Sequence, residues 1–167
     1  MSLTLILTRH AKSDWNNALA DQDRPLNGRG RANAPLIGAW LAGHGHVPDL
    51  VMCSNASRTT ETLALISPAF ADAAPILCHL PSLYHASATR ILGLIQRSEA
   101  AVLMVVGHNP GIGELAHQLA TAPPSNPGFS RYPTAATTVL RFDAAIWADV
   151  KPGAGEVIGF ITPRELS

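Results

Sequence analysis

Charge is scarce in this chain of 167 residues, because Asp, Glu, Lys and Arg together make up only 14% of it. The charges also cancel, since twelve basic residues balance twelve acidic ones. A chain without net charge or a clustered basic stripe creates no global field that attracts nucleic acid or anionic lipid. We therefore expect no nucleic-acid partner, and anion binding requires a local group of residues. Hydrophobic residues make up 47%, which excludes disorder.

Cysteines and long apolar runs are also few. Cys53 and Cys78 have neither the number nor the spacing of a disulfide framework or a zinc site, so we expect two reduced thiols in the core. The longest apolar stretches, such as residues 3–7 and 100–106, are far shorter than the roughly 20 residues that cross a bilayer. No basic segment precedes an apolar signal core at the N-terminus. These absences predict a cytoplasmic protein without a membrane segment, and the length fits one domain over residues 1–167.

Short aliphatic runs alternate with longer helical patterns along the chain. This alternation predicts an α/β fold, a three-layer α/β/α sandwich around a mostly parallel sheet. The expected strands cover residues 3–8, 50–53, 75–78, 101–106, 137–142 and 157–161. The expected helices cover residues 28–42 after an Asn27 cap, 58–66 after a Ser57 cap, 88–96, and 110–120 after an Asn109 cap. Four prolines between residues 121 and 135 predict an irregular surface loop.

Polar residues follow three of the expected strands. Arg9 and His10 end the first strand, and His108 follows the strand over residues 101–106. Arg58 lies in the first turn of the helix that follows the second strand. Ligands of open α/β sheets collect beyond the carboxyl ends of the strands, so we expect two imidazoles and two guanidiniums to share one pocket. Because guanidinium groups donate paired hydrogen bonds to phosphoryl oxygens, the implied ligand is a phosphate group.

Histidines in such a pocket have a specific chemistry. A neutral imidazole with a free lone pair can attack phosphorus, while a protonated second imidazole stabilises the charge on the phosphoryl group in transfer. The sequence therefore predicts covalent phosphoryl transfer through histidine. Each residue alone has a simpler interpretation, because a histidine at a strand end is more often structural and Arg58 could pair with Glu61 on the same helix. The combination of all four residues favours the catalytic interpretation.

Four segments resemble, in order and approximate spacing, the signatures of the histidine phosphatase superfamily, which includes the cofactor-dependent phosphoglycerate mutases. They are Thr8-Arg9-His10-Ala11-Lys12-Ser13-Asp14-Trp15-Asn16; Arg24-Pro25-Leu26-Asn27 with Gly30; Ser54 with Arg58 and Thr62; and Val106-Gly107-His108-Asn109-Pro110-Gly111. The small size, the Arg-His-Ala-Lys-Ser opening and the Gly-His-Asn-Pro segment are most similar to SixA-type phosphohistidine phosphatases. The resemblance extends through about Glu114 and implies a phosphoglycerate mutase-like fold.

The resemblance also implies roles for individual residues. His10 would be the nucleophile that is phosphorylated during turnover, and the phosphoryl group would be bound by Arg9, Arg58 and His108. Supporting substrate contacts would come from Ser13, Asn16, Arg24 and Asn109. The implied chemistry needs no metal and no cofactor, and the pair His44 and His46 does not complete a set of metal ligands.

The sequence departs from the superfamily at the general acid. Mutases and ester phosphatases of the superfamily carry a Glu or Asp between the second arginine and the second histidine, and it protonates the leaving alkoxide. Here that interval contains only Glu61, Asp72 and Glu99, and none of them has a fitting position. An imidazole leaves phosphorus more readily than an alkoxide, so cleavage of a phosphorus–nitrogen bond needs no dedicated acid. The acid is therefore absent, or it is one of Asp14, His79 and His85.

These observations predict a phosphohistidine phosphatase that removes phosphoryl groups from histidines of phosphocarrier or signalling proteins. Two alternatives stay open at this point. The first is a broad-specificity phosphatase of small phosphorylated molecules from the same superfamily. The second is a phosphoprotein-binding module without catalysis, in which the pocket holds phosphate but forms no covalent adduct.

Overall fold

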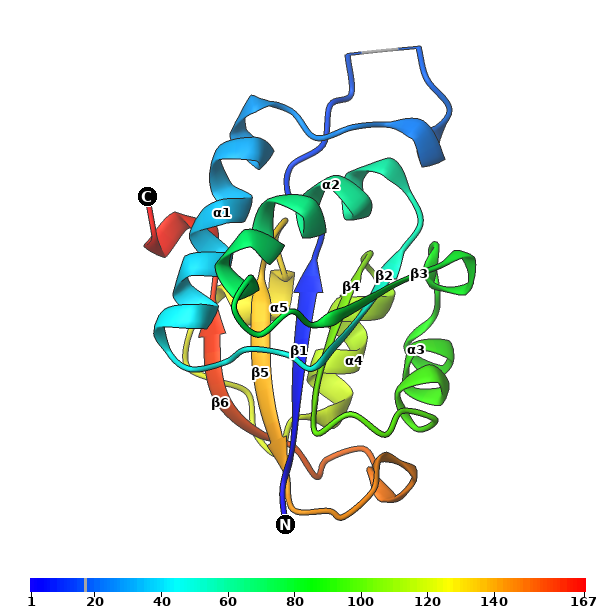
Figure 1. Cartoon of the computed structure of the whole chain (residues 1–167), viewed down its shortest axis with the longest axis vertical. Coiled ribbons are helices and arrows are strands. Elements are labelled where there is room, and N and C mark those ends of the chain that lie inside the picture. The colour runs from blue at the N-terminus through cyan, green and yellow to red at the C-terminus, as the bar shows by residue number, and fades with distance from the viewer. Residues whose placement is uncertain (17) are drawn as a thin grey trace.

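The computed structural model describes residues 1–16 and 18–167, which contain a six-stranded sheet with helices on both faces (Figure 1). The strand order is β3-β2-β4-β1-β5-β6. The strands are β1 (Leu3–Arg9), β2 (Leu50–Ser54), β3 (Ile76–Leu80), β4 (Val102–Gly107), β5 (Thr137–Phe142) and β6 (Glu156–Ile161). The first four are parallel, whereas β5 pairs antiparallel with β1 and β6 pairs antiparallel with β5. The predicted α/β fold with a mostly parallel sheet is confirmed, and all six expected strands are present.

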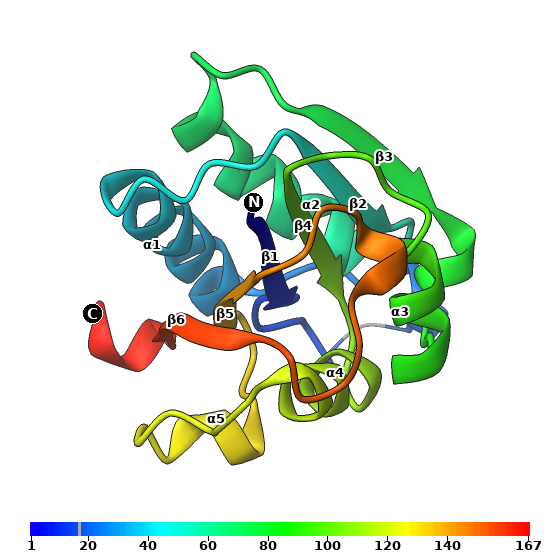
Figure 2. The same cartoon turned by 90° about the horizontal axis from the view of Figure 1, so that it is seen from below.

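The helices form the two outer layers. One face of the sheet carries α1 (Gly28–Gly43) and α2 (Ser57–Ile66), and the other carries α3 (Ala88–Ile95), α4 (Gly111–Leu119) and α5 (Gly128–Arg131) (Figure 2). Successive side chains of a strand point to opposite faces, so β1 contributes to both cores. Leu5 and Leu7 pack in the core beneath α3 and α4, while Ile6 packs beneath α1 and α2. Burial on both faces explains why β1 reads as a continuous apolar run.

The register of the central strands determines where the polar residues go. β1 and β4 pair in parallel with Arg9 opposite Gly107, and the backbone N–H of His10 donates to the Gly107 carbonyl at 3.0 Å. The next residue after each strand is therefore a histidine, His10 on one side and His108 on the other. β2 lies next to β4 and ends at Ser54, just before the helix that carries Arg58. One edge of the sheet thus receives all the predicted phosphate-binding residues.

The predicted Ser57 cap is wrong, whereas the Asn27 cap is confirmed by a bond from the Gly30 N–H to its side chain at 2.9 Å. α2 already begins at Ser57, and Ser57 makes no capping bond among the described residues. The Thr59 hydroxyl instead donates to the carbonyls of the residues before the helix. α4 begins at Gly111, one residue later than predicted, and Asn109 precedes a cis peptide bond, but its side chain accepts from the Gly113 N–H in the first turn at 3.1 Å.

The segment over residues 121–135, which the prolines predicted to be an irregular loop, contains a helical turn, α5. The turn forms because the Asn126 side chain accepts from the Gly128 N–H at 2.8 Å and the Phe129 ring is buried against the sheet. It ends at Tyr132, whose φ of 48° is left-handed. Across the ranges 1–16 and 18–167, no helix is long and apolar enough to cross a membrane.

Candidate active site

A cavity of about 200 Å³ lies at the carboxyl edge of the parallel strands. All four residues expected to bind and attack phosphorus line it: Arg9 and His10 at the end of β1, Arg58 from α2, and His108 after β4. The two imidazole rings lie 5.4 Å apart between their centroids. The expectation that the four side chains share one pocket is therefore met. The other lining residues are Lys12, Ser13, Trp15, Asp21, Arg24, His85, Asn109 and Thr134.

His10 has the properties of a nucleophile. Its Nδ1 lies 2.7 Å from the carbonyl oxygen of Ala11, and because a carbonyl only accepts, Nδ1 carries the proton. Nε2 therefore keeps its lone pair. Burial lowers the pKa of His10 to about 3, and the charges of Arg9 and Arg58 act in the same direction. The ring is consequently neutral at physiological pH, as attack on phosphorus requires.

Thr62 couples the nucleophile to the helix that carries Arg58. Its hydroxyl accepts from the Ala11 N–H at 3.0 Å and donates to the Arg58 carbonyl at 2.6 Å. Thr62 is fully buried, so this link between the end of β1 and α2 is shielded from water. The position of His10 relative to Arg58 is thereby held by side chains from both elements.

His108 is neutral in this pocket, whereas the sequence analysis expected a protonated ring. Burial lowers its pKa to about 3, and the neighbouring His10 and Arg58 lower it further. Its Nε2 lies 2.8 Å from the Ser54 hydroxyl, and its Nδ1 is buried without a hydrogen-bond partner among the described residues. An anion beside the ring favours the protonated form, so a bound phosphoryl group would raise the pKa of His108 from this value.

The buried guanidiniums of the cavity have N–H donors without hydrogen-bond partners among the described residues. Arg58 is only 2% exposed, and the Nε atoms of Arg9 and Arg58 have no partner within the described ranges. A buried donor left without an acceptor costs roughly 1–3 kcal/mol. With Nε of Arg24 and Nδ1 of His108, four buried nitrogen atoms without a partner belong to residues that line one small cavity. Phosphoryl oxygens would supply partners for such atoms, so the lining is suited to a tetrahedral or trigonal anion.

Asp21 is a functional residue that sequence reasoning missed. Its carboxylate lies 3.0 Å from the Arg58 Nη2 and 3.1 Å from the Arg24 Nη2, and its backbone carbonyl accepts from the Arg58 Nη1 at 2.7 Å. The Tyr84 hydroxyl donates to the same carboxylate, and His85 Nε2 lies 3.0 Å away. The hydrogen bond from Tyr84 is the largest cause that holds the pKa of Asp21 well below its usual range. Asp21 is therefore ionised and positions the cations instead of donating a proton.

The pairing of Arg58 with Glu61 does not occur. The Glu61 carboxylate accepts from the Leu26 N–H at 2.9 Å and pairs with Arg31. Asp21 replaces it as the partner of Arg58 from a loop 37 residues earlier in the chain. The one local signal for Asp21 is its spacing of three residues from Arg24, with which it forms an ion pair.

The four supporting candidates have different positions. Ser13 and Arg24 are buried, line the cavity and bond to each other, and the Arg24 guanidinium stacks on the Trp15 ring at 3.5 Å. Asn109 also lines the cavity, but its side chain is occupied by the Tyr132 carbonyl at 2.9 Å and the Gly113 N–H at 3.1 Å. Asn16 is exposed and is absent from the described lining residues.

Of the three acid candidates, His85 lines the cavity. Its ring centroid lies 5.0 Å from that of His108. His79 is exposed on the edge strand β3, and the Asp14 carboxylate accepts from the Asn16 N–H at 2.7 Å; neither is among the described residues of the lining. Gly111 helps to place His85, because any Cβ at Gly111 would lie 1.9 Å from the carbonyl oxygen of Ala86.

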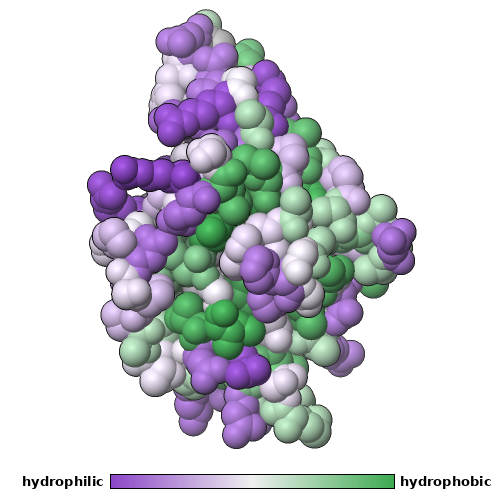
Figure 3. Space-filling model, turned by 90° about the vertical axis from the view of Figure 1, so that its left-hand side faces the viewer, coloured by the Kyte–Doolittle hydropathy of each residue, from purple (hydrophilic) through white to green (hydrophobic). Residues whose placement is uncertain are grey.

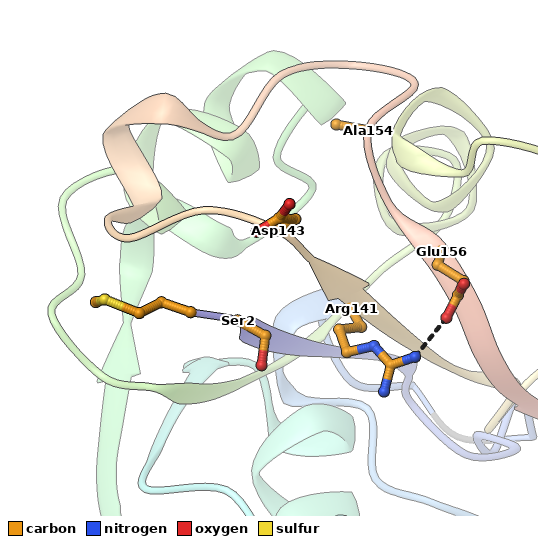
Figure 4. A pocket seen from close by; sticks show the side chains of 6 residues that line it. Ser2, Arg141, Asp143, Ala154 and Glu156 are labelled. Atoms are coloured by element: carbon orange, nitrogen blue, oxygen red, sulfur yellow. Dashed lines mark hydrogen bonds and ion pairs between the residues drawn. The ribbon is translucent and has the colours of Figure 1, made fainter.

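A second hollow, of about 380 Å³, lies at the opposite edge of the sheet, near the N-terminus (Figure 4). Arg141 lines it and forms an ion pair with Glu156 at 2.6 Å, while Asp143 and Ser2 lie on the other side. No histidine belongs to its described lining. In the part of the chain that the structure describes, no group of three His, Cys, Asp or Glu residues could hold a metal ion.

Comparisons with known proteins agree with this geometry. Residues 5–78 match the model of the histidine phosphatase superfamily (branch 1). An uncharacterised protein of Mycobacterium tuberculosis is 36% identical over 166 residues, which cover 93% of this chain and 99% of the relative. A structure from Nakamurella multipartitia, described as a candidate phosphohistidine phosphatase SixA, is 30% identical with a TM-score of 0.81, covering 98% and 97% of the two chains. The protein histidine phosphatase SixA complexed with tungstate shares the fold, with a TM-score of 0.79 at 21% identity over 99% and 100%.

Proposed function

Because the chain belongs to the histidine phosphatase superfamily and is a phosphatase, we propose that its substrate is phosphohistidine on a protein and that His10 carries the phosphoryl group between two half-reactions. The observation that carries the proposal is the state of His10, a neutral imidazole with a free Nε2 in a cavity where four buried nitrogens of Arg9, Arg24, Arg58 and His108 lack partners among the described residues. The similarity to a candidate phosphohistidine phosphatase at 30% identity supports the choice of substrate.

In the first half-reaction, Nε2 of His10 forms a bond to phosphorus while the bond from phosphorus to the substrate nitrogen breaks. A substrate ring that holds a proton on its other nitrogen leaves as neutral imidazole, so the step needs no proton from the enzyme. Arg9, Arg58 and His108 hold the three phosphoryl oxygens and stabilise their charge. The Ala11 carbonyl accepts the Nδ1–H bond of His10 and stabilises the positive ring that results.

In the second half-reaction, water attacks phosphorus and the bond to His10 breaks. The electron pair returns to Nε2, the proton from water passes to phosphate or solvent, and inorganic phosphate leaves. The guanidiniums stay in place through both steps, because Asp21 and Tyr132 hold their Nη atoms from behind. This positioning avoids reorganisation when charge develops on the phosphoryl oxygens.

The state of Asp21 favours a leaving group that needs no acid. Asp21 is the single carboxylate among the described lining residues, and its four partners keep it ionised. A general acid must carry a proton when the leaving group departs, which an ionised carboxylate does not. An alkoxide therefore finds no carboxylic acid in the pocket, whereas an imidazole does not require one.

The test is a comparison of kcat/KM for three substrates: a histidine-phosphorylated carrier protein, an aryl phosphate and an alkyl phosphate such as 3-phosphoglycerate. We expect the phosphohistidine protein to be hydrolysed fastest, the aryl phosphate next and the alkyl phosphate slowest, which follows the leaving groups. Faster hydrolysis of the alkyl phosphate than of phosphohistidine would contradict the proposal and support a broad phosphatase of small molecules, with His85 as the proton donor.

A further inference from the structure

A depression larger than the catalytic cavity adjoins the active site. It is a groove of about 900 Å³ between the start of α1, the segment over residues 125–134 and the C-terminal segment over residues 162–165. Lys12 and Thr134 line both this groove and the cavity of His10, so the two spaces meet. The walls formed by α1 and the C-terminal segment belong to the side of the molecule that Figure 3 presents, where hydrophilic side chains gather over the upper part.

The groove concentrates positive charge in a chain that has none overall. Four cations line it, Lys12, Arg29, Arg131 and Arg164, and Glu165 is the one carboxylate of the described lining. All four cations are exposed, and none of them forms an ion pair or a side-chain hydrogen bond with another described residue. The arginines that face Asp21, Glu61 and Glu156 form ion pairs with carboxylates, whereas the four groove cations form none, although the charge of Arg164 helps to lower the pKa of Glu165.

The acidic residue of the groove is already occupied. One Glu165 oxygen accepts from the Thr162 N–H at 2.8 Å, and the other lies 2.7 Å from the Asn126 Nδ2 and 3.0 Å from the Thr162 hydroxyl. These bonds tie the proline-bearing loop to the C-terminal segment, so two walls of the groove are held together. The groove is thus preformed, and its unpaired charges are cationic.

We propose that this groove binds an acidic segment of the protein that presents its phosphohistidine to His10. The proposal rests on the proposed phosphohistidine substrate and adds a second contact to it. The catalytic cavity, at about 200 Å³, holds little more than the reacting group, whereas the groove of about 900 Å³ accommodates a stretch of polypeptide. Carboxylates of such a stretch would complement the four free cations and orient the substrate toward the shared wall of Lys12 and Thr134.

The size of the effect follows from the exposure of the cations. Each exposed ion pair contributes about 0.2–1 kcal/mol, so a few of them change affinity about fivefold to tenfold. Salt weakens such contacts, because the Debye length is about 8 Å at physiological ionic strength. We therefore expect the groove to act on KM and to leave the chemical step unchanged.

The experiment uses two synthetic peptides of equal length that carry one phosphohistidine, the first flanked by Asp and Glu and the second by Asn and Gln. The wild type is expected to show a KM about fivefold lower for the acidic peptide, with similar kcat for both. The double variant Arg29→Glu/Arg164→Glu should abolish or reverse this preference while hydrolysis of p-nitrophenyl phosphate stays at the wild-type rate. Neither arginine lines the catalytic cavity among its described residues.

The matched control is Arg97→Glu/Lys151→Glu, which makes the same change of charge at two exposed cations outside both spaces as the structure describes them. It should keep the preference for the acidic peptide. Fluorescence anisotropy with the same two peptides, in which a non-hydrolysable triazolyl phosphonate replaces phosphohistidine, measures affinity without turnover. Because this affinity does not depend on hydrolysis, it tests the groove separately from the assignment of phosphohistidine as the substrate.

The proposal is overturned if the wild type binds both phosphonate peptides equally, or if Arg29→Glu/Arg164→Glu retains the preference. It is also overturned if the double variant loses p-nitrophenyl phosphate turnover to the same extent, because the two arginines would then act on the phosphoryl group itself. Loss of the preference in the double variant alone, together with a KM that rises with salt for the acidic peptide only, supports it.

Discussion

The two edges of the sheet each carry a hollow with an arginine and a carboxylate, yet only one of them is suited to chemistry. At the edge near the N-terminus, the side chains of Arg141 and Glu156 are 52% and 63% exposed and satisfy each other. At the carboxyl edge, Arg58 is almost fully buried, and Asp21 occupies its Nη atoms but not its Nε. An exposed ion pair contributes at most about 1 kcal/mol and attracts nothing further. A binding site therefore needs buried donors in excess of the acceptors that the protein provides.

The largest effect is expected from removal of the nucleophile. His10→Ala should reduce phosphatase activity by at least about 10³-fold, because it removes the nitrogen that the proposed mechanism uses to form the covalent intermediate. Incubation of the wild type with a labelled substrate should place an acid-labile phosphoryl group on His10, detected on denaturing gels, and the variant should not be labelled. Circular dichroism should show an intact fold. A folded variant with full activity would contradict the role of His10, and a wild type that neither hydrolyses the substrate nor is labelled would support a binding module without catalysis.

The next variant contrasts the two edges directly. Arg58→Ala should lower kcat/KM by about 10²–10³-fold, the usual loss when a donor to a charged transition state is removed. Arg141→Ala makes the same change at the opposite edge and should leave kcat/KM at the wild-type value. Steady-state kinetics with an aryl phosphate provide the measurement. Equal losses in the two variants would show that the comparison between the edges is wrong.

A smaller loss is expected at the carboxylate behind the cations. Asp21→Asn keeps the shape of the side chain but removes the charge that holds Arg58, Arg24 and His85, so kcat/KM should fall about tenfold. The pKa of Asp21 is lowered in the folded state, so its contribution to stability is present above the unfolded value of about 4 and is lost as pH falls. The drop in Tm from pH 7 to pH 3 should therefore be smaller in Asp21→Asn than in the wild type. An unchanged drop would contradict this assignment.

The smallest effect concerns stability at mildly acidic pH. The pKa of His108 is lowered to about 3 by burial. Between pH values of about 6.5 and 3, His108 is therefore protonated in the unfolded chain and neutral in the folded chain. Stability is consequently lost as pH falls through that window. His108→Gln cannot take up this proton, and its Tm should fall by several degrees less between pH 7 and pH 4.5. Inorganic phosphate should reduce the fall in the wild type, because the anion favours protonated His108. A variant whose Tm follows the wild type at every pH would refute the sign.

The chemistry of the site was more predictable than its supporting contacts. The four central residues follow buried strands or a helix start, so their convergence follows from the rule that parallel strands end at one edge. The contacts of Asp21 with Arg58, Tyr84 and His85 join residues far apart in the sequence, and its spacing from Arg24 was the one local signal. The simpler local interpretation, a pair between Arg58 and Glu61, is excluded because Arg31 and the Leu26 N–H take that carboxylate.

The strands of the fold were predictable from the sequence, whereas the helical turn α5 was not. The strands are buried on both faces and therefore read as apolar runs, which locates them without knowledge of the tertiary structure. The helical turn at Gly128–Arg131 depends on one side-chain bond from Asn126 and on burial of Phe129, both of which are set by distant parts of the chain. Proline counts alone could not reveal it. The neutral state of His108 was missed for the same reason, since burial and the neighbouring charges exist only after folding.

The pairing of Arg9 with Gly107 across β1 and β4 has an evolutionary and practical implication. The spacing of the two imidazoles is inherited from the hydrogen-bond ladder of adjacent strands and owes little to the surrounding loops. Wall segments such as residues 121–135 and 162–165 can then diverge, or be exchanged in chimeras, while the reactive pair keeps its alignment. Under the proposed groove, these wall segments would set which phosphorylated partner binds, while the central strands set the position of the two imidazoles.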